Sequence, residues 1–157
     1  MLEIGQPAPA FRLPDTEKNF HELENFKGKP LVILFFPFAF TGVCTTELCS
    51  MRDDIAYYSN LNAQIIAISV DSPFALARFK EEQQLNFPLL SDFNKAAIAA
   101  YGCRYESFAA ETVGVAKRSA FVVDADGILQ YAEVLDNAGQ LPNFDAVKAT
   151  LEALPKA

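Results

Sequence analysis

The chain alternates short, continuous runs of apolar residues with longer segments in which apolar residues recur at helical spacing. The runs Leu31–Phe36 and Gln64–Val70 are rich in branched and aromatic residues, which predicts two strands buried in the centre of a sheet. Pro37 ends the first run, because proline has no N–H group to continue a strand ladder. The pattern predicts a helix after each run: about Thr45 to Asn60, then about Pro73 to Gln84 with Asp71 or Ser72 as its cap.

The second half of the chain predicts a hairpin and a last helix. Asp124-Ala125-Asp126-Gly127 is a strong turn signal between strands at Ala120–Val123 and Ile128–Val134. Asn143 is a candidate cap for a helix over Phe144–Leu154. Minor elements complete the pattern: a weak strand at Phe11–Leu13, a polar turn at Pro14–Asn19, a connector at Phe20–Phe26, a brief strand at Leu89–Leu90, a short helix at Lys95–Tyr101 ending at Gly102, and an irregular loop at Tyr105–Lys117.

Strands that alternate with helices, followed by a hairpin and a helix, predict an α/β fold with a central mixed β-sheet covered on both faces. With 157 residues, of which 51% are hydrophobic, residues 1–157 are expected to form a single domain. We find no linker or internal repeat that would divide it. The longest apolar region, around Leu31 to Phe40, is too short to span a bilayer, so no membrane association is expected.

The charge and the cysteine count exclude several classes of protein. A formal net charge of -7, with dispersed Lys and Arg, provides no basic stripe for nucleic acid. The N-terminal segment Met1–Gly5 carries no secretory pattern, which favours a cytoplasmic protein. Three cysteines without CxxC spacing are expected to be thiols. The single histidine, His21, is interpreted as a surface or connector residue, and it leaves a Cys–His metal site short of ligands.

The segment that follows the first apolar run carries the candidate chemistry. Pro37, Thr41 and Cys44 stand at fixed spacing, with Cys44 in or just before the first turn of the predicted helix. Free N–H groups and the helix dipole stabilise an anion there, so Cys44 is a candidate thiolate nucleophile. The hydroxyl of Thr41 is placed to donate a hydrogen bond to that thiolate or to a bound oxygen ligand. Pro37, which has no N–H group and a fixed φ, is expected to shape and shield the pocket. The alternative for Cys44 is an inert buried cysteine.

The segment around Cys44 resembles the peroxidatic cysteine loop of the peroxiredoxins, and most closely that of the AhpE-type branch. The segment reads Phe36-Pro37-Phe38-Ala39-Phe40-Thr41-Gly42-Val43-Cys44-Thr45-Thr46-Glu47-Leu48. Three further segments resemble family segments in the same order: Gly5–Phe11, Phe87–Asp92, and Arg118–Asp124. The resemblance implies a thioredoxin-like fold with an N-terminal extension.

Carried over to this chain, the resemblance implies that Cys44 attacks the peroxide O–O bond, that Thr41 hydrogen-bonds the peroxide and the thiolate, and that Arg118 stabilises the developing charge. Pro37 would shield the sulfur. Glu47 would orient an arginine, and its alternative is a solvated glutamate in the first helical turn. The alternative for Thr41 is an ordinary loop hydroxyl, and the alternative for Pro37 is a proline that only ends the strand. The alternative for Arg118 is a charge at the strand edge. No metal or organic cofactor is implied, and similar proteins are often dimers.

The other two cysteines decide how an oxidised Cys44 would be recycled. At about 100° per residue, Cys44 faces the apolar side of the predicted helix and Cys49 points about 140° away. Their Cα atoms would be roughly 8 to 9 Å apart in an intact helix, too far for a disulfide, so direct pairing requires unwinding. The Cys44-x4-Cys49 spacing resembles the bacterioferritin-comigratory (Prx-Q) branch, in which the second cysteine resolves the sulfenic acid. Cys49 or an external thiol would therefore resolve the sulfenic acid, and the alternative for Cys49 is a flank cysteine without a redox role. Cys103 is interpreted as core filler, with a resolving or intersubunit role as its alternative.

The leading prediction is a thiol-dependent peroxidase that reduces hydrogen peroxide or organic hydroperoxides and is recycled by a thioredoxin- or glutaredoxin-type reductant. Two other functions remain open on the sequence. One is a redox sensor that oxidises once at Cys44 and signals to a partner. The other is a thiol-disulfide oxidoreductase, against which the absence of a CxxC motif argues.

Overall fold

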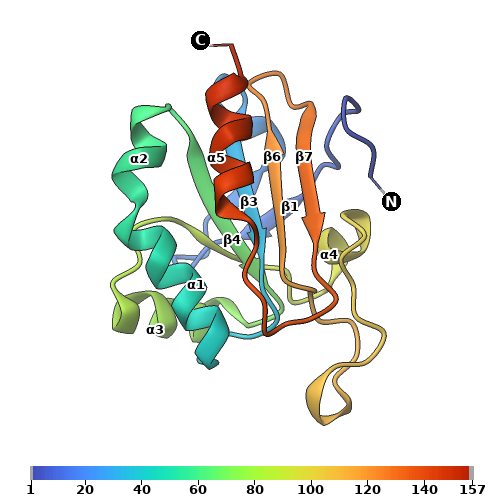
Figure 1. Cartoon of the computed structure of the whole chain (residues 1–157). Helices are drawn as coiled ribbons and strands as arrows, with labels where there is room; N and C mark the ends of the chain where they lie inside the picture. Colours follow the sequence, from blue (N-terminus) through green and yellow to red (C-terminus); the bar gives the residue numbers. More distant parts are fainter. Residues whose placement is uncertain (1, 156–157) are drawn as a thin grey trace.

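The computed structural model of the protein describes residues 2–155 and shows a five-stranded mixed sheet (Figure 1). The strand order is β5-β4-β3-β6-β7; β3 pairs with β4 and β4 with β5 in parallel, whereas β6 is antiparallel to both β3 and β7. The mixed sheet predicted from the sequence is confirmed. The strands are β3 (Leu31–Phe35), β4 (Gln64–Ser69), β5 (Leu89–Ser91), β6 (Ser119–Val123) and β7 (Leu129–Val134).

Helices cover one face of the sheet, and a short helix with the N-terminal segment covers the other. The first face carries α1 (Gly42–Asp53), α2 (Ile55–Asn60), α3 (Pro73–Gln83) and α5 (Phe144–Ala153). The second carries α4 (Ala96–Ala100), the hairpin of β1 (Arg12–Pro14) and β2 (Phe20–Glu22), and the 3-10 helix η1 (Leu23–Phe26). None of the helices between residues 2 and 155 combines the length and apolar character needed to cross a membrane.

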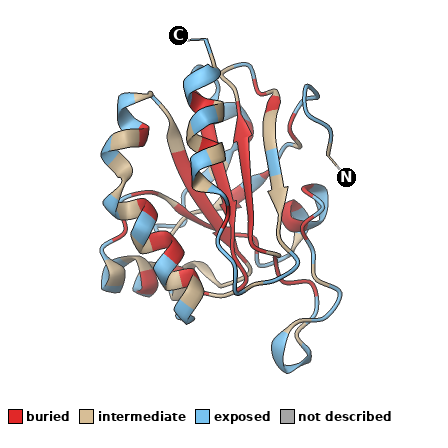
Figure 2. Cartoon of the chain, viewed as in Figure 1, coloured by how far each residue is buried: buried red, intermediate tan, exposed pale blue. Residues whose placement is uncertain are grey.

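Strand β3 lies at the centre because its side chains serve both faces. Val32 and Leu34 join the apolar cluster under α1, α3 and α5, whereas Ile33 and Phe35 join the cluster under α4 and the N-terminal segment. Every residue of β3 is buried, as Figure 2 shows for the middle of the sheet. A continuous apolar run is the pattern that such a strand requires.

The helix predicted over Thr45–Asn60 differs from the structure at both its start and its middle. It begins earlier, at Gly42, and it is two helices that meet at Asp54, where φ is -102° and ψ is 10°. The Asp54 carboxylate contacts Lys148 Nζ of α5 at 2.5 Å. Aspartate has low helix propensity, and this contact with a distant helix favours the break.

The predicted connector Phe20–Phe26 contains structure that the sequence did not indicate. It forms β2 and η1, and β2 pairs with β1 so that His21 lies opposite Leu13. The strand has only three residues, all exposed or half-buried, and so it has no apolar alternation. His21 hydrogen-bonds Asp15 Oδ2 at 2.7 Å, in agreement with its interpretation as a connector residue.

The predicted turns and caps are confirmed. Asp124 Oδ1 accepts hydrogen bonds from the N–H groups of Asp126 and Ile128. Gly127 takes a φ of 85°, a backbone conformation that residues with a side chain disfavour. Ser72 caps α3 by accepting from Ala75 N, and Asn143 caps α5 by accepting from Ala146 N. The 105–117 loop folds back on itself through the bridges Arg104↔Ala116 and Phe108↔Thr112 and contains the short 3-10 helix η2 (Ala109–Glu111).

Candidate active site

Cys44 lies in the first turn of α1, at the edge of the sheet where β3 ends. Thr41 is the N-cap residue of the helix, so Cys44 is the third helical residue. Its side chain is 1% exposed and packs in the apolar cluster with Leu48 and Met51 of the same helix. The predicted position in the first turn and the inward orientation are both confirmed. The helix dipole and the free N–H groups of this turn favour a negative charge on the sulfur.

Arg118 brings a positive charge to the sulfur from a distant part of the chain. Because β6 runs antiparallel to β3 with Ser119 opposite Phe35, the residue before β6 lies beside the loop that leaves β3. The Arg118 Nη2 group donates to Cys44 Sγ at 3.2 Å, and the arginine is only 2% exposed. The alternative of a solvated strand-edge charge is therefore wrong for Arg118.

Glu47 is the second partner of Arg118. It lies three residues after Cys44, on the same face of α1. Arg118 Nη1 donates to Glu47 Oε1 at 2.9 Å, and Glu47 is fully buried, so the alternative of a solvated first-turn glutamate is wrong. Glu47 Oε2 has no hydrogen-bond partner among residues 2–155. Burial raises the pKa of Glu47 from its ordinary value of 4.5 to about 7, against the opposing effect of Arg118.

One guanidinium thus faces two acidic groups in a buried site. Burial by itself lowers the pKa of Arg118, but Glu47 and Cys44 together raise it above its usual value, so the arginine stays charged. A thiolate at Cys44 and a carboxylate at Glu47 would leave a net negative charge on the cluster. The two groups therefore share one positive charge.

The loop after β7 supplies a contact that the sequence did not indicate. The carbonyl oxygen of Ala138 accepts from Arg118 Nε at 3.2 Å and from Arg118 Nη2 at 3.0 Å. Asp136 in the same loop is joined to Lys117 Nζ at 2.8 Å. A backbone carbonyl is present at every residue, so no residue type could have marked Ala138 as a partner of the arginine.

A cavity of about 280 Å³ opens onto the sulfur. It is lined by Pro37, Phe38, Thr41, Gly42, Val43, Cys44, Phe108, Arg118, Ala138 and Gly139. The lining joins three of the residues predicted from the motif, Pro37, Thr41 and Cys44, with Arg118, and Phe108 of the 105–117 loop forms an apolar wall that the sequence did not single out. The Thr41 hydroxyl donates to the carbonyl of Phe38 at 2.9 Å, so its proton is directed away from the sulfur and its lone pairs remain.

The other two cysteines lie apart from this cavity. Cys49 is half-buried at the margin of the apolar cluster that holds Cys44, and its thiol donates to Gln83 Oε1 of α3 at 3.4 Å. Cys103 is fully buried in the cluster on the opposite face of the sheet, and burial raises the pKa of its thiol to about 12. This placement favours the interpretation of Cys103 as core filler.

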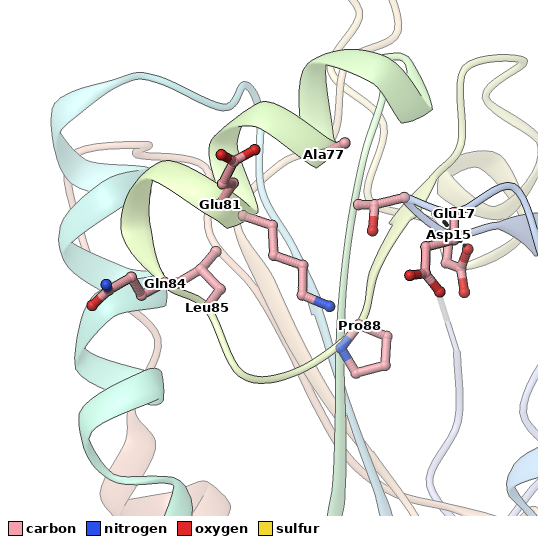
Figure 3. A pocket seen from close by; sticks show the side chains of 9 residues that line it. Asp15, Glu17, Ala77, Glu81, Gln84, Leu85 and Pro88 are labelled. Atoms are coloured by element: carbon pink, nitrogen blue, oxygen red, sulfur yellow. Dashed lines mark hydrogen bonds between the residues drawn. The ribbon is translucent and has the colours of Figure 1, made fainter.

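A larger hollow, of about 470 Å³, lies between the turn after β1 and helix α3. Figure 3 shows Asp15 and Glu17 on one side and Glu81 with Gln84 on the other. It shares no lining residue with the cavity at Cys44. Cavity size alone therefore does not identify the reactive site in this molecule.

A thioredoxin-like fold that holds a buried cysteine at a helix N-terminus against an arginine defines a thiol-based redox protein. Residues 4–132 match the model of the AhpC/TSA family. Over 137 residues the chain is 38% identical to alkyl hydroperoxide reductase E of Mycobacterium tuberculosis H37Rv (85% of this chain and 86% of the relative). It is 35% identical to peroxiredoxin Bcp of Escherichia coli K12 over 131 residues (83% and 84%).

Among solved structures, the crystal structure of peroxidoxin BcpB from Mycobacterium tuberculosis superposes with a TM-score of 0.87 at 28% identity, covering 99% of each chain. The chain belongs to the AhpC/TSA family of peroxiredoxins. The prediction of a thiol-dependent peroxidase is confirmed, and the similarity to both the AhpE and the Bcp type of relative agrees with the two resemblances drawn from the motifs.

Proposed function

We propose that Cys44 is the sulfur that this peroxidase oxidises. The observation that carries the proposal is the contact of Arg118 Nη2 with Cys44 Sγ at 3.2 Å in a buried site that opens to one cavity. The Cys44 thiolate attacks one oxygen of a hydroperoxide, the O–O bond breaks, and the second oxygen leaves as water or alcohol after taking up a proton. The sulfur is oxidised to a sulfenic acid and the peroxide is reduced.

Arg118 acts at two stages of this step. Its charge favours the thiolate before the reaction, and its N–H groups favour the charge that develops on the leaving oxygen. The Ala138 carbonyl and Glu47 hold the guanidinium in one orientation, so Glu47 is a positioning residue. Buried donors that need no rearrangement during the reaction are the most effective form of such stabilisation.

Thr41 and Pro37 shape the place where the peroxide binds. The lone pairs of Thr41 Oγ1 accept a hydrogen bond from the O–H group of a hydroperoxide. When the hydroxyl rotates away from the Phe38 carbonyl, it donates a hydrogen bond to the thiolate instead. Pro37 lines the same cavity and has no N–H group that would draw water to the sulfur. Both roles follow from the position of these residues in the cavity wall.

The sulfenic acid is returned to the thiol by Cys49 or by an external thiol. In the first route Cys49 leaves Gln83, the start of α1 unwinds, and the Cys49 thiolate displaces the oxygen of the sulfenic acid as water to form a disulfide. In the second route an external thiol attacks the sulfenic acid of Cys44, forms a mixed disulfide with it and releases water. A reductant of the thioredoxin or glutaredoxin type completes either cycle. We propose hydrogen peroxide and organic hydroperoxides as substrates, a homodimer as the assembly, and the cytoplasm as the location.

A peroxide sensor is the second candidate from the sequence, and it is not favoured. The relatives carry names of reductases and peroxiredoxins, which turn over. Steady-state consumption of peroxide with a thioredoxin system separates the two functions, because a sensor oxidises once and then stops.

The experiment that tests the proposal replaces Cys44 by serine. We expect Cys44→Ser to lose at least about a thousandfold of the rate of peroxide consumption, because serine is not ionised near neutral pH and supplies no reducing sulfur. The matched control is Cys103→Ala, which lacks the buried cysteine on the other face of the sheet and is expected to keep the first oxidation. Peroxide reduction that persists in the folded Cys44→Ser variant would contradict the proposal.

A further inference from the structure

The backbone of the loop that joins β3 to α1 is hydrogen-bonded to the rest of the molecule at one point, although the rings of Phe38 and Phe40 also pack on Phe108 and Phe79. Within residues 2–155, the backbone of residues 37–41 makes a single hydrogen bond to a segment outside 36–45: the Ala39 N–H group donates to Asp71 Oδ2 at 2.8 Å. Ala39 is only 7% exposed, so its N–H group needs a partner from the protein. Asp71 comes from the end of the neighbouring strand β4, 32 residues later in the chain.

Asp71 is itself held rigidly by the end of the sheet. Ser69 Oγ donates to the same carboxylate oxygen at 2.6 Å and accepts from the Asp71 N–H group at 3.2 Å. Ser91 Oγ donates to the backbone carbonyl of Asp71 at 2.6 Å. Ser69 and Ser91 are buried, and they are the paired last residues of β4 and β5. A short chain of hydrogen bonds thus connects two strand ends to the loop.

The conformation of the loop explains why such an attachment is needed. Phe40 takes a φ of 66°, in the left-handed region that a residue with a side chain adopts only at a cost. A strained backbone persists where the surroundings over-determine it. The carboxylate at Asp71 is a strong acceptor for this purpose, because a hydrogen bond to an ionised group is roughly twice as strong as a neutral one.

We propose that Asp71 is a positioning residue of the peroxidase reaction, which fixes the loop Pro37–Thr41 over the sulfur through its bond to Ala39. The inference rests on the proposed function of Cys44. Asp71 touches neither Cys44 nor Arg118 in any of the hydrogen bonds described, and it acts through the loop that carries Pro37 and Thr41. Without it, Arg118 still contacts the sulfur, but the groups that line the peroxide site lose their fixed place.

This division of roles predicts a selective loss. Reaction with a peroxide needs the substrate aligned between the thiolate and the loop, and a displacement of about 1 Å costs on the order of a hundredfold in rate. Alkylation of the same thiolate by iodoacetamide needs no such alignment. Loss of Asp71 therefore lowers the rate with peroxide and leaves the rate of alkylation equal or higher, because a looser loop exposes the sulfur.

The experiment compares three variants with the wild type in both reactions at one pH. In Asp71→Ala we expect the second-order rate constant with hydrogen peroxide to fall by about tenfold to a hundredfold, with no fall in alkylation of Cys44 by iodoacetamide. In Asp71→Asn the amide oxygen still accepts from Ala39, so we expect a loss of about three- to tenfold. Asn143→Ala removes the cap of α5, far along the chain from the loop, and is the control for general destabilisation. We expect it to keep the rates of both reactions.

Three results would overturn the inference: unchanged peroxide rates in both Asp71 variants, equal losses in the two reactions, or the same selective loss in Asn143→Ala. If Asp71→Ala does not fold, the test rests on Asp71→Asn. In that variant, a ratio of the peroxide rate to the iodoacetamide rate equal to that of the wild type counts against the role of Asp71. Mapping of the oxidised sulfur in the wild type keeps the two proposals apart. Oxidation at a sulfur other than Cys44 would contradict the proposed function, whereas oxidation at Cys44 with normal ratios would contradict only the role of Asp71.

Discussion

At Glu47 a carboxyl group without access to solvent shares one guanidinium with the thiol of Cys44. Its Oε2 atom has no hydrogen-bond partner in the described part of the chain, which suits a protonated carboxyl better than a carboxylate. With the Glu47 proton in place, the whole charge of Arg118 is available to the Cys44 thiolate. The protonation of Glu47 therefore bears on both the stability of the fold and the reactivity of the sulfur.

Stability should fall as the pH rises from about 4.5 to about 7, as far as Glu47 determines it. The pKa of Glu47 is raised by burial from 4.5 in the unfolded chain to about 7 in the folded protein. Between these values the folded state binds more protons than the unfolded state, so the free energy of unfolding decreases with pH; below 4.5 the full contribution is present. The expected loss is on the order of 3 kcal/mol, since the two pKa values differ by about 2.5 and one pKa unit corresponds to about 1.4 kcal/mol.

Urea unfolding of the wild type and of Glu47→Gln at a series of pH values measures this contribution. Glutamine keeps an oxygen for Arg118 and does not titrate, so the difference in unfolding free energy between the two proteins should shift in favour of Glu47→Gln as the pH rises. A difference that is constant from pH 4.5 to 8 would show that Glu47 does not take up a proton on folding.

At the scale of an element, the later part of α1 is bound to α3, whereas its first turns contact Arg118 through Cys44 and Glu47. Arg52 Nη1 donates to the carbonyl of Gln83 at 2.5 Å, and Cys49 donates to the side chain of the same residue. The first turn begins at Gly42, where a Cβ atom would meet nothing within 4 Å. Unwinding that brings Cys44 to Cys49 is therefore expected to begin at the first turn, with the end of α1 left on α3.

We expect Gly42→Ala to slow disulfide formation without slowing oxidation of Cys44. Alanine fits without a clash and stabilises the helical backbone by about 0.4–1 kcal/mol, which corresponds to a two- to fivefold slower unwinding of the first turn. The measurement is the mass of the protein at intervals after one equivalent of hydrogen peroxide, where addition of oxygen and loss of two hydrogens separate sulfenic acid from disulfide. Cys49→Ser is the control that should stop at the sulfenic acid; a wild type that also stops there would show that an external thiol resolves.

At the scale of the whole molecule, one sheet is shared by two apolar clusters. β3 supplies side chains to both, so a change in this strand affects both clusters. Helix α5 is joined to α2 by a hydrogen bond from Tyr57 to Glu152, and to the junction of α1 and α2 by the ion pair of Lys148 with Asp54. These connections support the prediction that residues 1–157 form a single domain.

A single domain predicts one cooperative unfolding transition. Urea unfolding followed by far-UV circular dichroism and by tyrosine fluorescence should give coincident curves for the reduced protein. Ile33→Ala should lower the free energy of unfolding by about 2–5 kcal/mol and keep one transition, because the cavity lies in the strand common to both clusters. Two separate transitions, or probes that disagree, would contradict the single-domain prediction.

The local patterns of the sequence were sufficient for much of the fold. The buried runs identified β3 and β4, the Asp124–Gly127 turn identified the hairpin, and the caps at Ser72 and Asn143 identified helix starts, because each depends on residues close together in the chain. The break at Asp54 and strand β2 were missed. The break at Asp54 depends on a contact with the distant helix α5, and β2 has only three residues with no apolar alternation, so no local pattern records either of them.

For the reactive site, the sequence by itself determined the position of Cys44 at the start of a helix, since the ending of a strand and the beginning of a helix are local events. The motif supplied Arg118 as a partner, but only the tertiary structure decided that it reaches the sulfur, because the antiparallel register of β6 on β3 brings together residues 74 positions apart. The burial of Glu47, the Ala138 carbonyl on Arg118 and the attachment of Ala39 to Asp71 likewise follow from how strands and loops pack, and packing across the molecule has no signature in the order of neighbouring residues.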